Sequence, residues 1–171
     1  MKKLLSVFLN ICLLRAGPQD LPAASVVLVL ATAANMVIGT LIALPNYSFG
    51  QSLAWSVVDL LLLGVVAHIS LLWRGKRSRF PQTFSALAGS GALLSVLGWP
   101  VLLMLGRLPE GDANAALPSL LLVVLLFWSI VVIANILRHA LSATYSVGLL
   151  AALLYVIVSW NLSGILFPSA N

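Results

Sequence analysis

The stretch PSLLLVVLLFWSIVVIANIL, residues 118–137, contains no charged side chain. A helix of about 20 residues rises about 30 Å, which matches the hydrocarbon core of a bilayer. Four more stretches of similar character lie along the chain, at about residues 22–44, 52–73, 83–106 and 146–167. The sequence therefore predicts an all-α integral membrane protein, a bundle of five transmembrane helices.

The composition of the whole chain agrees with this fold class. Of its 171 residues, 61% are hydrophobic and only 8% are charged, and the mean hydropathy is +1.11. A soluble domain carries about 25% charged residues, so a soluble enzyme and a disordered tail are both excluded. The nine Lys and Arg residues give a net charge of +5, but they stand in short runs between apolar stretches. We therefore predict no nucleic-acid partner.

Residues 1–16 are interpreted separately from the transmembrane domain of residues 17–171. After the basic start, Lys3, Ser6 and Asn10 form a narrow polar stripe on an otherwise apolar helix. This pattern is typical of a short amphipathic helix that lies in the membrane interface. A cleaved signal peptide and a helix docked in the bundle are the alternatives. No A-x-A cleavage site follows the apolar stretch, which disfavours the signal peptide.

The basic residues predict the orientation of the chain. One side of the membrane receives eight of them, whereas the other side receives only Arg107. By the positive-inside rule, the N-terminus is cytoplasmic and the C-terminus is periplasmic or extracellular. We expect a multi-pass protein of the bacterial inner (plasma) membrane. The basic loop after the second span is expected to contact anionic lipid headgroups; its cations are Arg74, Lys76, Arg77 and Arg79.

Asp59 is the most informative single residue, because a carboxyl group inside a membrane span is energetically costly. By helical rise it lies about 10 Å inside the second span, and Asn35 and Asn161 fall at a similar depth. We therefore predict a polar layer of Asp59, Asn35 and Asn161 between packed helices. Two readings stay open: hydrogen-bonded structural contacts, or a site for an ion, a proton or a lipid headgroup.

Two further groups of residues are candidates for helix contacts. His68 and Asn135 lie near the cytoplasmic ends of their spans and form a possible second polar layer. The third span carries small residues at a spacing that lets helix backbones approach each other, and a proline follows them. The residues that we assign to this packing are Ser85, Gly89, Gly91 and Pro100.

No arrangement typical of an enzyme is present in the sequence. We find no nucleophile–base pair, phosphate-binding loop or pair of catalytic carboxylates. One cysteine and two histidines are too few to suggest a zinc site. The sequence therefore predicts no catalytic residues, no metal and no cofactor.

Two stretches resemble the bacterial form of the Yip family of small five-span membrane proteins. They are FPQTFSALAGSGALLSVLGWPVLLML at 80–105 and LLFWSIVVIANILRHALSATYSVGLLAALLYVIVSW at 125–160. The resemblance implies a non-enzymatic protein that organises lipids or partner proteins. Eukaryotic members bind Rab-type GTPases through a polar N-terminal region, but this N-terminus is short and apolar, so that property is not transferred.

These observations lead to two functional hypotheses. The first is an accessory, scaffold or assembly subunit that contacts lipids and either a protein partner or a second copy of itself. The second is a small transporter, or a component of an ion-coupled permease, in which Asp59 binds and releases a proton.

Overall fold

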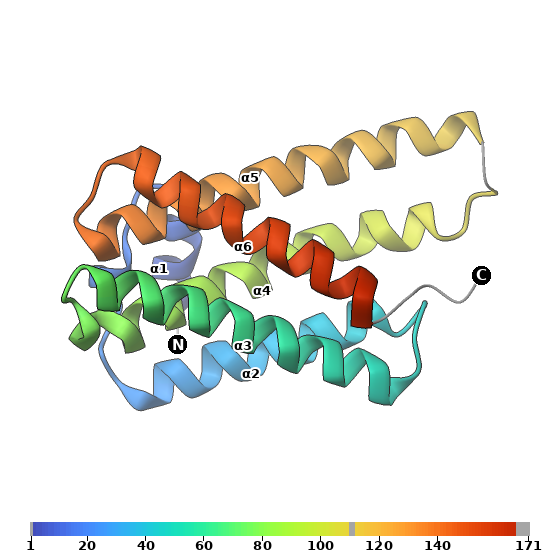
Figure 1. Cartoon of the computed structure of the whole chain (residues 1–171). Helices are drawn as coiled ribbons and strands as arrows, with labels where there is room; N and C mark the ends of the chain where they lie inside the picture. The colour runs from blue at the N-terminus through green and yellow to red at the C-terminus, as the bar shows by residue number, and fades with distance from the viewer. Residues whose placement is uncertain (1, 110–111, 167–171) are drawn as a thin grey trace.

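The computed structural model describes residues 2–109 and 112–166, and within them every regular element is helical (Figure 1). Five helices are long and apolar enough to cross a membrane, which confirms the predicted fold class. A shorter helix, α1 (Lys2–Cys12), precedes them. The five long helices are α2 (Ser25–Ala43), α3 (Phe49–Trp73), α4 (Phe80–Leu105), α5 (Ala116–Leu141) and α6 (Tyr145–Leu166). Single 3-10 turns occur at Pro18–Asp20, Arg77–Arg79 and Ala113–Ala115.

The helix boundaries agree with the predicted spans to within a few residues. α3 begins at Phe49 rather than near residue 52, because Ser48 and Gln51 form a capping box. α5 continues about one turn beyond residue 137 and ends at Leu141, where the capping residue Ser142 has a left-handed φ of 48°. The predicted end of the last span, residue 167, lies outside the residues that the structure describes.

Charged side chains of the loop between α3 and α4 explain why α5 continues past residue 137. The Lys76 Nζ atom donates to the Leu141 carbonyl at 3.1 Å, and an Arg79 Nη atom donates to the Ala140 carbonyl at 3.3 Å. The last carbonyls of a helix have no partner within it and attract cations. The 74–79 loop therefore stabilises the end of α5.

α4 lies at the centre of the bundle and packs against α2, α3 and α5, while α6 packs against α5 and α3. Figure 1 shows that α6 starts beside the C-terminal part of α5 and crosses in front of the bundle toward α3. The small side chains of α4 are deeply buried, as expected from the sequence: Ala86 and Ala88 are fully buried, and Ser85 bonds to the Pro81 carbonyl at 2.7 Å. Pro100 lies within α4 on its exposed side.

α1 is an amphipathic helix, as predicted, and one of its faces is docked on the long helices. The Phe8 ring lies against Gly89 of α4, and the Cys12 thiol lies 3.9 Å from the Ser90 carbonyl. The Trp128 indole of α5 donates to the Cys12 carbonyl at 3.0 Å and so satisfies the C-terminal end of α1. These are the contacts of the docked helix that the sequence left as an alternative. The interfacial location stays a prediction.

Candidate functional site

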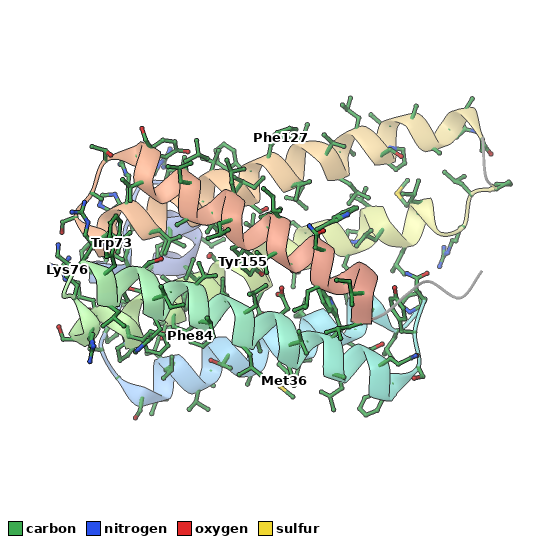
Figure 2. All side chains as sticks on the ribbon, viewed as in Figure 1. Met36, Trp73, Lys76, Phe84, Phe127 and Tyr155 are labelled. Carbon is green, nitrogen blue, oxygen red and sulfur yellow. The ribbon has the colours of Figure 1, made fainter. Side chains whose placement is uncertain are left out.

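Asp59 lies ten residues into α3, which places it about 15 Å from that end of the helix. This is deeper than the sequence suggested, because α3 begins earlier than expected. The Tyr155 hydroxyl of α6 lies 2.9 Å from both carboxylate oxygens, and the Ser159 hydroxyl donates to Oδ1 at 2.8 Å. Asp59 therefore joins α3 to α6 through two hydroxyl donors. Figure 2 labels Tyr155 on α6, where it faces α3.

These three side chains line an open cavity of about 500 Å³ between the long helices, which we call the Asp59 cavity. All five long helices contribute to its wall, which is mainly apolar with a few polar side chains. A mainly apolar cavity of roughly 300–1,000 Å³ with a few converging polar groups is typical of a small-molecule site. Besides two tryptophans, the remaining polar residues of the wall are Asn35, Ser90, Ser95, Ser129 and Ser163.

Of the three residues of the predicted polar layer, Asp59 and Asn35 line one cavity, whereas Asn161 does not. Asn35 lines the same cavity as Asp59, but its amide donates to the Ala88 carbonyl at 2.9 Å. Asn161 is exposed and donates to the Ile157 carbonyl of its own helix at 2.7 Å. Two residues of a helix that are two positions apart point in nearly opposite directions. Ser159 faces Asp59, and Asn161 consequently faces away.

Gly91 makes the position of Asn35 possible. A Cβ atom at residue 91 would lie 2.8 Å from the Asn35 amide nitrogen, so any larger residue would force the Asn35 amide to shift. The small-residue spacing in α4 therefore has two consequences. Gly89 accommodates Phe8 of α1, and Gly91 accommodates Asn35 of α2.

His68 and Asn135 occupy different environments. His68 is exposed, meets the Phe80 ring edge-on with 5.5 Å between ring centroids, and lines a groove with Gly64 and Phe84. Asn135 is 3% exposed, does not line that groove, and its amide nitrogen has no hydrogen-bond partner among the described residues. The structure therefore does not bring these two side chains into one layer.

Replacing Asn135 with leucine is expected to leave the stability unchanged or to raise it by about 1–3 kcal/mol. The reason is that a buried donor without a partner costs roughly this much, and a leucine of similar size has no polar group to bury. Thermal unfolding in detergent measures the effect, with Asn135→Asp as the destabilised comparison. A loss of more than about 1 kcal/mol in Asn135→Leu would contradict this expectation and show that the amide holds the bundle together.

The four cations of the 74–79 loop divide into two kinds. Lys76 and Arg79 bind the end of α5, and Arg79 also donates to the Ser142 hydroxyl at 3.2 Å. Arg77 is exposed, and the Arg74 guanidinium lies over the Trp73 ring at 5.9 Å. The first pair has a structural role that the sequence did not reveal. Headgroup contacts remain a prediction for all four.

The structure describes no cluster that would suggest a metal centre. Within residues 2–109 and 112–166, no three His, Cys, Asp or Glu side chains lie close enough together to hold a metal ion. The polar groups of the Asp59 cavity are one carboxyl group, several hydroxyls, one amide and the indoles of two tryptophans.

Comparison of the chain with family models, curated proteins and solved structures finds no match. The resemblance to the Yip family accordingly stays a prediction. Tyr155 and Ser159 are the site residues that sequence reasoning missed. Their spacing of four residues on one helix face was the available signal, because such a pair faces a single neighbour on an adjacent helix.

Proposed function

We propose that the protein binds a small amphiphilic molecule inside the membrane, in the Asp59 cavity, as a transporter or a lipid-handling protein does. One observation supports this most: Asp59 sits in the wall of a cavity of about 500 Å³ and, among the residues that the structure describes, receives hydrogen bonds from two hydroxyl groups. A carboxylate has about four acceptor positions, and Tyr155 and Ser159 have one proton each to donate. About two positions therefore stay available to a ligand or a proton.

The proposal is non-enzymatic, and it develops the second of the two hypotheses drawn from the sequence. A purely structural role for Asp59 requires hydrogen bonds between helices, but it gives no reason for a cavity beside them. Intramembrane carboxyl groups commonly belong to substrate or proton pathways. The cytoplasmic location of the 74–79 loop and the inner membrane as the compartment stay predictions of the sequence.

Native mass spectrometry of the protein, purified in a mild detergent, tests the proposal. We expect wild-type protein to carry a bound small molecule that is absent from Ser129→Phe. Among the described residues the Ser129 hydroxyl donates to the Leu126 carbonyl of its own helix and not to Asp59, so a phenylalanine there takes up space in the cavity while Asp59 and its hydroxyl donors are kept. Asp59→Asn keeps the side-chain shape, and we expect at least a tenfold lower occupancy in that variant.

The matched control is Thr32→Phe. Thr32 makes the same kind of local bond, to the Leu28 carbonyl at 2.8 Å, and does not line the cavity. We expect its occupancy to equal that of wild type. A wild-type protein without any bound molecule, or an adduct that survives in Ser129→Phe, would overturn the proposal.

An accessory or scaffold role is the second candidate, and the exposure of α6 favours it. Only Gly148 and Ala152 of this helix are buried, and three of its large apolar side chains, Leu150, Leu154 and Ile157, are exposed. A partner helix could cover this face, where lipid would otherwise lie. A partner present at a fixed ratio after purification, together with an empty Asp59 cavity, would favour this function instead.

A further inference from the structure

The electrostatic character of the Asp59 cavity restricts what it can bind. Among the described residues of its wall, Asp59 is the one carboxyl group, and none is Lys, Arg or His. An anionic headgroup would therefore meet a like charge without any compensating cation in a medium of low dielectric constant. A cation, in contrast, would neutralise the carboxylate and occupy the acceptor positions that Tyr155 and Ser159 leave open.

Aromatic side chains line the cavity together with the carboxyl group. Trp55 precedes Asp59 by four residues, so both lie on one face of α3, and both line the cavity. Tyr155 and Trp160 line it from α6. The faces of such rings attract organic cations. A cavity that holds one carboxylate and three aromatic residues is therefore suited to a positively charged organic group.

The rest of the wall indicates the chemical character of the uncharged part of the ligand. Leucines from three helices contribute to it, among them Leu63, Leu94 and Leu125. Because this surface lies within membrane-spanning helices, a ligand reaches it most readily by partitioning into the bilayer. These features call for an apolar body attached to the charged group.

We infer that the ligand of the Asp59 cavity is a lipophilic organic cation, with its positive charge at Asp59 and its apolar body against the leucines. This inference rests on the proposed function and specifies its substrate class. Alkylated ammonium and tetraarylphosphonium compounds belong to this class.

Two ions of the same shape and opposite charge test the inference: tetraphenylphosphonium and tetraphenylborate. Equilibrium dialysis of each against the full chain in detergent, corrected with protein-free micelles, gives the affinity. We expect saturable binding of the cation to wild-type protein and at least tenfold weaker binding of the anion. Protons should compete with the cation, so its binding should fall as the pH is lowered.

The variants separate loss of charge from loss of the fold. We expect Asp59→Asn to weaken cation binding at least tenfold and Trp55→Leu to weaken it several-fold, while Thr32→Phe binds as wild type does. The comparison of the two ions on wild-type protein stands even where a variant does not fold.

Two results would overturn this inference. One is equal or tighter binding of tetraphenylborate that is lost in Ser129→Phe; the cavity would then be a ligand site, and only the charge assignment would fail. The other is no saturable binding of the cation. The proposed function is judged independently, by the adduct in native mass spectrometry, so the two failures are distinguishable.

Discussion

Gly148→Ala is expected to destabilise the protein by about 3 kcal/mol, which corresponds to a fall in Tm of about 6–12 °C for a chain of this size. α6 crosses α5 at this residue. A Cβ atom at 148 would collide with the Ala134 backbone oxygen and would lie 3.0 Å from the Arg138 backbone nitrogen. Backbone atoms cannot rotate aside as a side chain can, so the two helices have to separate.

Gly164→Ala is the matched control, because Gly164 lies on the same helix with nothing within 4 Å of the position of a Cβ atom. We expect this variant to be as stable as wild type or up to about 1 kcal/mol more stable, since alanine is the better helix former. Thermal unfolding of both proteins in the same detergent makes the comparison. Equal Tm values for the two variants would show that the α5–α6 crossing tolerates a wider separation.

The overall fold follows from the sequence because hydropathy and length determine which segments cross a membrane. In a bilayer every backbone polar group has to be satisfied internally, so each long apolar stretch becomes a helix. The ends of the helices were harder to predict. The extra turn of α5 depends on Lys76 and Arg79, which lie about 60 residues away in the chain.

The candidate site was predicted in part, for a physical reason. Asp59 is conspicuous because of the cost of a carboxyl group in a membrane span. Its partners depend on how α6 is rotated relative to α3, and depth along the helix does not reveal that rotation. Asn161 has a suitable depth but faces away, whereas Tyr155 and Ser159 have both the depth and the direction.

Gly89→Leu is expected to expose Cys12 and to raise its rate of maleimide labelling by about 100-fold at neutral pH. A Cβ atom at residue 89 would overlap the Phe8 ring, with further ring atoms at 2.7 Å, so the larger leucine displaces α1 from α4. Cys12 is the only cysteine of the chain and is 7% exposed. Its labelling therefore reports directly on whether α1 is docked.

The expected size of this effect comes from ionisation, because the thiolate is the reactive form. Burial raises the pKa of Cys12 from 9.0 to about 11, which lowers the thiolate fraction at neutral pH by about 100-fold. The thiol stays protonated while α1 is docked. Its contribution to docking is consequently present below pH 9.0 and is lost as the pH rises through about 11.

Two variants separate undocking from a general loss of structure. Phe8→Ala removes the ring from the other side of the contact and should accelerate labelling as well. Gly91→Ala lies only two residues from Gly89 but on nearly the opposite side of α4, where it meets Asn35 rather than α1, so Cys12 should stay slow to react. In wild type and in Gly91→Ala the labelling rate should rise with pH about a midpoint near 11, whereas in the undocked variants the midpoint should move toward 9.0. Rapid labelling of wild-type protein at neutral pH would mean that α1 leaves the bundle without any substitution.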